Sequence, residues 1–336
     1  MVNITTYDFI NSNSRKTVWL MILFPISLAV IVYLAIFLIS AMGTDNNQTY
    51  NQISILTIAN QTAIYILPIV SAIAILWILI SYYTGQSFIL STAGAIELTR
   101  NNASEIIRIV ENIAMTAGLP VPKVYAINDA ALNAFATGRD PKHSYVVLTK
   151  GIINKLEKTE LEGVIAHEMA HIGNRDTRLM LIMIVCISFA TIIAELLLRF
   201  ALTTRTNNSK NNNAAVIQLF LFALAIAFYI YGYLVAPLIK FALSRTREFQ
   251  ADATAALITR NPQGLIDALK KISGNSTINK LSDKETISPI CIANPLAKNK
   301  QNSFFSKISG LLATHPPIED RIKALQTMDG YRLNRH

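Results

Sequence analysis

Charged residues are scarce in this chain. Only 15% of its 336 residues are Asp, Glu, Lys or Arg, whereas 52% are hydrophobic, and the mean hydropathy is +0.38. Such a composition argues against a soluble globular protein, because long apolar stretches would have no core large enough to cover them. It predicts a protein that lives in a membrane.

Cysteine is also scarce, with Cys186 and Cys291 as the only two residues of this type. Their spacing fits no cysteine metal site, and nothing in the sequence implies a disulfide. Basic residues outnumber acidic ones by 30 to 21, which gives a net charge of +9. Most basic residues flank apolar stretches, so attraction to anionic lipid explains them more simply than nucleic acid does. We expect no nucleic-acid partner.

Four apolar stretches are long enough to cross a hydrocarbon core, which takes about 20 residues. They are Val18–Met42, Ile64–Tyr82, Leu179–Leu198 and Val216–Phe241. The third stretch carries Glu195, so a buried core helix stays open as an alternative there. Arg199 lies four residues further on, which favours an ion pair near the membrane interface over a functional intramembrane acid.

Basic residues also set the expected orientation. Arg15 and Lys16 precede the first stretch, whereas Gly43–Ala63 contains no Lys or Arg. The positive-inside rule therefore places the N-terminus in the cytoplasm. Arg205 and Lys210, between the third and fourth stretches, argue the other way, but the first helix usually dominates. We expect the segment after the second stretch to be cytoplasmic as well.

Histidine occurs 5 times, and two of these residues lie in His167-Glu168-Met169-Ala170-His171. On a helix, residues i and i+4 share one face, so both imidazoles can reach one point. Zn²⁺ binds neutral imidazoles, and the intervening Glu can take a proton from water. A helix is predicted here, with Thr159 as N-cap, Glu162 closing a capping box and Gly173-Asn174 as the stop. The motif predicts a zinc peptidase site, with two incidental histidines on a surface helix as the alternative.

A third ligand is expected beyond the fourth apolar stretch. Two crossings return the chain to the side of the histidines near Lys240, where a helix is predicted from Arg245 to Leu257. Glu248 and Asp252 share one face of that helix. One carboxylate can bind the metal while the other accepts the N–H of a ligating histidine. Spacing alone leaves both assignments open, as well as an ordinary solvated helix face.

Four motifs together carry a resemblance to a known family. They are His167-Glu168-Met169-Ala170-His171, Glu248-Phe249-Gln250-Ala251-Asp252, Asn133-Ala134-Phe135-Ala136-Thr137-Gly138 and Thr314-His315-Pro316-Pro317. Over nearly its whole length the chain resembles the HtpX family of membrane zinc endopeptidases, which is related to the CAAX-processing prenyl proteases. The resemblance implies one Zn²⁺ per chain and an active site on the cytoplasmic side of the inner membrane. It also implies a role in quality control of damaged or misfolded membrane proteins.

The resemblance assigns roles to individual residues. It implies that His167, His171 and Glu248 are the zinc ligands. It also implies that Glu168 is the general base and that Asp252 is a carboxylate behind the ligands. It implies an edge strand that pairs with the substrate backbone, formed by Asn133, Ala134, Phe135 and Ala136. His315 and Arg321 resemble a pair near the oxyanion. The Asn-rich loop Thr203–Asn213 and the polar segment Lys280–Asn302 depart from the family's pattern.

The expected fold class is a mainly α membrane protein with about four transmembrane helices and a small α+β zincin-like catalytic domain. Turn residues around His143, interpreted as a loop residue, predict a hairpin. The predicted strands are Pro122–Ile127, Asn133–Thr137 and Ser144–Thr149, and further helices are predicted at Ser104–Ala117, Pro262–Ile272 and Pro317–Met328. The chain then divides into an N-terminus (1–16), a first helix pair (17–83), a catalytic front half (84–177), a second helix pair (178–241) and a catalytic rear half (242–336).

Two other functions stay open. One is a CAAX-type protease acting on prenylated C-termini, although four spans are few for the large intramembrane chamber of those enzymes. The other is a non-catalytic membrane scaffold or chaperone, against which Glu168 argues, because a binding module needs no base. The expected partners are polypeptide substrates, above all membrane proteins, and the lipid bilayer. The sequence does not determine the oligomeric state.

Overall fold

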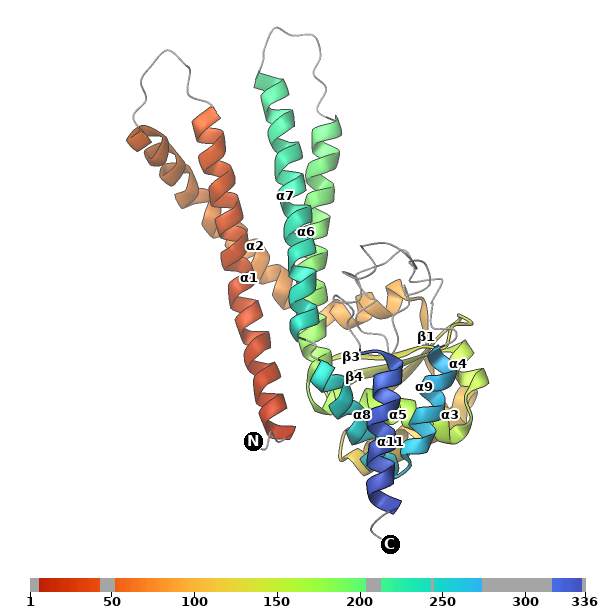
Figure 1. Ribbon diagram of the computed structural model, residues 1–336. Helices are drawn as coiled ribbons and strands as arrows, with labels where there is room; N and C mark the ends of the chain where they lie inside the picture. Colours follow the sequence, from red (N-terminus) through yellow and green to blue (C-terminus); the bar gives the residue numbers. More distant parts are fainter. Residues whose placement is uncertain (1–5, 43–51, 204–212, 243–244, 274–315, 334–336) are drawn as a thin grey trace, which may run out of the picture. The chain divides into compact units, whose positions relative to one another are not determined.

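The computed structural model describes residues 6–42, 52–203, 213–242, 245–273 and 316–333 (Figure 1). The chain forms two compact units. We call the first the sheet unit; it contains Met1–Lys16, Tyr82–Ile184 and Pro237–His336. The second, the helical unit, contains Thr17–Ser81 and Val185–Ala236.

Among the described residues, the helical unit consists of the larger parts of four long helices, which are α1 (Thr6–Met42), α2 (Gln52–Thr92), α6 (Asp176–Thr203) and α7 (Asn213–Ala242). Three segments of the described residues are long and apolar enough to cross a membrane, namely Ile10–Ala41, Ile55–Thr92 and Asp176–Thr203. In α7 the described apolar segment is shorter, Gln218–Gly232. The chain is thus a mainly α membrane protein, and its fourth span stays a prediction.

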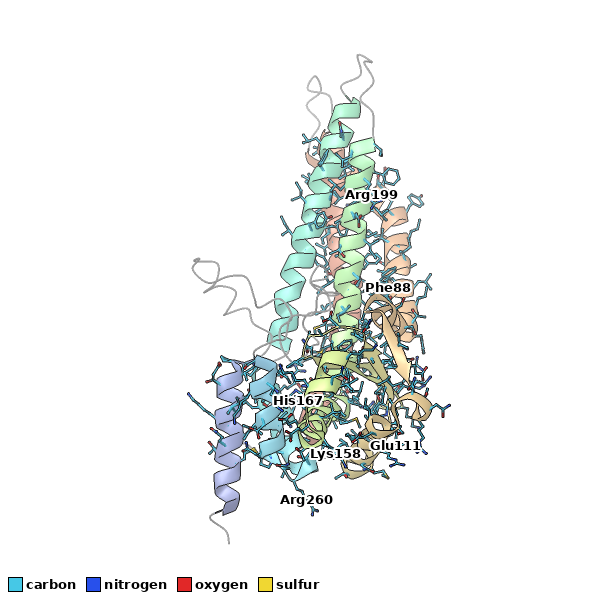
Figure 2. All side chains as sticks on the ribbon, turned by 90° about the vertical axis from the view of Figure 1, so that its right-hand side faces the viewer. Phe88, Glu111, Lys158, His167, Arg199 and Arg260 are labelled. Carbon is cyan, nitrogen blue, oxygen red and sulfur yellow. The ribbon has the colours of Figure 1, made fainter. Side chains whose placement is uncertain are left out.

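Side chains inside the helical unit satisfy their polar groups locally. The Trp77 indole donates to the Val185 carbonyl at 3.3 Å, and the hydroxyls of Ser27 and Tyr231 lie 2.5 Å apart. The expected Glu195–Arg199 ion pair forms along α6, with both side chains more than half exposed. Figure 2 shows Arg199 on this helix. An exposed pair one turn apart fits an interfacial role better than a buried functional acid.

The loop predicted between the first two apolar stretches, Gly43–Ala63, extends too far toward the second stretch. Helix α2 already begins at Gln52, and its first turns pack on α1 through Ala59 and Ala63. Tyr33 of α1 also donates to the Asn60 side chain at 2.8 Å. The reason is that the chain contains no Gly or Pro from Gln52 to Ala63, so nothing stops the helix before the apolar stretch begins.

The sheet unit holds a four-stranded mixed sheet of order β1-β2-β4-β3, formed by β1 (Ala95–Leu98), β2 (Lys123–Ile127), β3 (Ala134–Asp140) and β4 (His143–Thr149). Only β2 and β4 run parallel. The hairpin β3–β4 was expected, although His143 is the first residue of β4 rather than a loop residue. Strand β1 was not expected, because its four half-exposed residues have no strand pattern of their own and depend on pairing with β2. Strand β3 is an edge strand.

Among the described residues, six further helices belong to this unit, and they are α3 (Arg100–Ala117), α4 (Lys150–Lys155), α5 (Lys158–Gly173), α8 (Arg245–Thr259), α9 (Pro262–Ser273) and α11 (Ile318–Leu333). Figure 1 shows α5 beneath the sheet, grouped with α8, α9 and α11. Nearly all of α5 is buried, and it shares one hydrophobic core with the sheet and these helices. A small α+β domain is thus built around one central helix.

The start of α5 differs from the prediction. The N-cap is Glu157, whose N–H donates to the Glu160 carboxylate at 2.8 Å, instead of Thr159 with Glu162. Glu160 is buried and also pairs with Lys271 of α9 at 2.7 Å. Both spacings fit a capping box, and the tertiary ion pair selects the earlier one. The predicted stop is confirmed, since α5 ends at Gly173 with Asn174 as C-cap.

Candidate metal and catalytic site

Helix α5 places His167, which is labelled in Figure 2, and His171 one turn apart, and both side chains are buried. Their Nε2 atoms lie 3.1 Å from each other. Glu248, in the first turn of α8, brings its two carboxylate oxygens to 3.7 Å from these nitrogens, one oxygen to each. Within the part of the chain that the structure describes, these three residues form the one group with metal-ligand spacing.

The donor atoms fit a divalent metal such as zinc. Each imidazole presents its other nitrogen, Nδ1, to a buried carboxylate at 2.9 Å, His167 to Asp252 and His171 to Asp176. These contacts place a proton on each Nδ1, so both Nε2 lone pairs point at one place. Two lone pairs and the charge of Glu248 repel one another unless a cation lies between them. Zn²⁺ takes this set of nitrogen and oxygen ligands.

The pKa values show how the group behaves without a cation. Burial alone would lower the pKa of His171, but the hydrogen bond that His171 donates to Asp176 and the charge of Glu248 outweigh it and raise the pKa to about 9. Burial and the nearby Arg321 guanidinium lower the pKa of His167 to about 4. Without a metal, His171 therefore keeps a proton, and its positive charge balances the negative charge of Glu248 that a metal ion would otherwise neutralise.

Glu168 lies between the metal-ligand group and the edge strand. Its carboxylate is buried and accepts a hydrogen bond from the Ala136 backbone N–H of β3. Burial raises the pKa of Glu168 to about 7, with the negative charge of Glu248 acting in the same direction. A carboxylate with such a pKa can both accept and release a proton near neutral pH.

Strand β3 turns part of its backbone toward this carboxylate. The Thr149 N–H donates to the Asn133 carbonyl at 3.0 Å, so Asn133 and, two residues further on, Phe135 direct their backbone groups to β4. Ala134 and Ala136 then direct theirs to the opposite side, where Glu168 lies. All four residues are buried. The strand expected to bind substrate thus borders the site, and its role stays a prediction.

Arg321 is fully buried behind the metal-ligand group. It holds Asp252 through two hydrogen bonds, 2.8 Å from Nε and 2.6 Å from Nη2, and its Nη1 lies 3.8 Å from Glu248. Burial would raise the pKa of Asp252, but the Arg321 charge outweighs it and lowers the pKa to about 2. Arg321 therefore supports the carboxylate behind His167. Its expected place near an oxyanion stays a prediction, and His315 lies outside the described residues.

Sequence reasoning missed the carboxylate behind His171. Asp176 begins α6, immediately after the turn that ends α5, and it is held by Arg247 and Asn13. One signal was available, since an acidic residue five positions after the second histidine follows directly on the predicted helix stop. No signal marked Asn13, which is distant in the sequence.

A buried His-His-Glu group beside a second buried glutamate, in a chain with membrane-spanning helices, defines a membrane metalloprotease. The profile of Peptidase family M48 matches residues 100–329, and the chain belongs to that family.

Several relatives agree with this assignment. A "Protease HtpX homolog" of Bacteroides fragilis is 40% identical over 317 residues, covering 94% of this chain and 96% of the relative. Proteins of the same name are 41% identical in Dictyoglomus turgidum, covering 74% of this chain and 77% of the relative, and 39% identical in Listeria monocytogenes, covering 78% and 86%. A weaker likeness, which plays no part in this assignment, is to the crystal structure of S. mikatae Ste24p, at 18% identity and a TM-score of 0.41, covering 88% of this chain and 61% of that protein.

Proposed function

We propose that this membrane metalloprotease is a zinc-dependent endopeptidase that hydrolyses peptide bonds of misfolded or damaged membrane proteins at the cytoplasmic face of the inner membrane. The observation that carries the proposal is the position of Glu168. It is buried next to the two histidines and Glu248, and it hydrogen-bonds the edge strand β3. The names of the M48 relatives as protease homologues support peptide-bond hydrolysis.

The proposed ligands are His167, His171 and Glu248, which would hold one Zn²⁺ per chain. When bound, zinc supplies a Lewis acid that makes water more acidic and polarises a carbonyl group. Glu168 takes the proton from the attacking water and passes it to the leaving amine, for which a pKa near neutrality is suited. Asp252 keeps the His167 imidazole in its Nδ1–H tautomer.

The substrate is proposed to bind as an extended strand beside β3. Backbone groups of Ala134 and Ala136 lie on the side of β3 that does not pair with β4, and Asn133 and Phe135 support the strand from the β4 side. Strand addition would present the scissile bond next to Glu168. Burial of this edge favours a substrate that has lost its own structure, because only an unfolded segment can enter as a single strand.

His315 and Arg321 are proposed on the oxyanion side of the scissile bond. The guanidinium of Arg321 holds Asp252 through two hydrogen bonds and also lies 3.8 Å from Glu248. A hydrogen bond or positive charge on the oxyanion side would stabilise the negative charge that develops on the carbonyl oxygen.

The test combines metal content with cleavage by the purified full-length protein. Wild type should contain about one zinc per chain and degrade an unfolded membrane protein and casein. Glu168→Gln should keep the zinc and lose nearly all cleavage, because an amide cannot accept the proton. Glu162→Gln is a matched control on the same helix, away from the site, and should cleave normally. Substantial cleavage by Glu168→Gln, or preferential cleavage of a prenylated peptide, would overturn the proposal.

A further inference from the structure

The turn after α5 brings a buried carboxylate back to the second histidine. The helix ends at Gly173, Asn174 caps it, and Arg175 takes a left-handed conformation with φ of 62°. That conformation is uncommon for a residue other than glycine and reverses the chain sharply. As a result Asp176, at the start of α6, places its Oδ2 atom 2.9 Å from the Nδ1 atom of His171.

The second oxygen of this carboxylate is held by two other segments of the chain. Arg247 donates to Asp176 Oδ1 from Nη1 at 2.6 Å, and Asn13 donates to the same oxygen from Nδ2 at 2.7 Å. The side-chain oxygen Oδ1 of Asn13 accepts from Arg247 Nη1 at 3.1 Å, while Asn13 Nδ2 also donates to the Asn174 backbone carbonyl at 2.8 Å. All four residues are buried. A side-chain amide suits this position because it donates and accepts at once.

These contacts connect parts of the chain that each carry a piece of the site. Arg247 directly precedes Glu248 in α8, and Asp176 follows the helix that carries His171. Asn13 belongs to the part of α1 that lies in the sheet unit, ahead of Thr17, where the helical unit begins. The first turns of α1 therefore contribute to the hydrogen-bond network behind His171.

We propose that Asp176 is a positioning residue for His171 and that Asn13 keeps Asp176 in place, so the N-terminal turns of α1 form part of the metal site. This inference rests on the proposed metal site. Asp176 accepts the Nδ1–H of His171 and leaves Nε2 to face the metal. Asn13 and Arg247 donate hydrogen bonds to the other carboxylate oxygen, and these bonds prevent the carboxylate from rotating away.

The experiment measures zinc affinity of full-length variants by competition with a chelator, together with thermal unfolding of the metal-free protein. Asp176→Ala should lose about 10–100-fold in zinc affinity, the range for a partner behind a metal ligand. Asp176→Asn keeps an acceptor oxygen and should recover part of that loss. Asn13→Ala and Asn13→Asp should each weaken zinc binding about tenfold, because both remove the donor to Asp176.

Asn11→Ala is the matched control, since Asn11 is the same residue type on the same helix and is exposed. It should bind zinc as wild type does. If Asp176→Ala fails to fold, the Asn13 variants decide the matter. The inference is overturned if folded Asn13→Ala binds zinc with wild-type affinity, whether or not the metal-free protein loses stability. That result would show that Asn13 only stabilises the fold. Absence of zinc from the wild type would instead overturn the proposed function.

Discussion

The Nε2 atoms of His167 and His171 face each other across 3.1 Å, while their Nδ1 atoms each contact a different buried carboxylate. The two carboxylates therefore hold both imidazoles in the Nδ1–H tautomer, from the side of each ring opposite Nε2. Because the ligand atoms are arranged before any metal arrives, little conformational entropy is lost on binding.

Metal binding should depend on pH through the proton on His171. In the metal-free protein the pKa of His171 is about 9, so this residue is protonated below that pH and must release its proton when a metal binds. Apparent affinity should rise about tenfold per pH unit between about pH 7 and about pH 9 and then level off. Zinc titrations against a chelator across this range test the slope. A flat profile would contradict the raised pKa.

The two carboxylates of α8 should differ in their effect on the metal. Glu248→Ala removes a direct ligand, so the purified protein should be nearly zinc-free and inactive. Asp252→Ala removes a partner of His167 and should cost about 10–100-fold in affinity while some activity remains. Metal content and casein cleavage of both variants are the measurements. The roles are exchanged if Asp252→Ala loses the metal and Glu248→Ala keeps it.

Helix α5 should tolerate no side chain at its crossing with α9. A Cβ atom on Gly163 would lie 2.8 Å from the Leu265 backbone nitrogen, so one helix would have to shift. Gly163→Ala should destabilise the protein by about 1–3 kcal/mol. Activity should also fall, since α5 carries the histidines. Gly173→Ala is the control, because its Cβ would meet only the flexible Leu119 side chain at 3.4 Å. Equal thermal unfolding of the two variants would refute this prediction.

The orientation in the membrane can be tested with single cysteines in a background lacking Cys186 and Cys291. The charges before the first span predict that Asn47 lies outside and the sheet unit in the cytoplasm. A membrane-impermeant thiol reagent should label Asn47→Cys in intact cells. It should label Asn154→Cys, at an exposed position of α4, only after permeabilisation. The reverse pattern would place the active site outside.

Much of the site followed from local sequence pattern. The spacing of His167 and His171 requires only a helix to bring two imidazoles to one point, and the helix stop at Gly173 was readable from residue type. Length and apolar composition were enough for three of the spans, since a hydrocarbon core accepts little else. The fourth span, on which the predicted return of the chain to the region of Glu248 depends, stays a prediction. These features depend on period, length and order, all of which are present in one sequence.

Tertiary structure decided which polar groups meet. Asn13, Asp176 and Arg247 are separated by up to 234 positions, yet they share one buried hydrogen-bond network behind His171. Arg321 and Asp252 are likewise distant in the sequence and meet only in the folded chain. Strand β1 depends on pairing with β2, and the start of α5 at Glu157 depends on the ion pair between Glu160 and Lys271. Pairings of this kind follow no sequence period. Burial of a charge is favourable only once its distant partner is in place, and the sequence pattern does not show which residue that partner is.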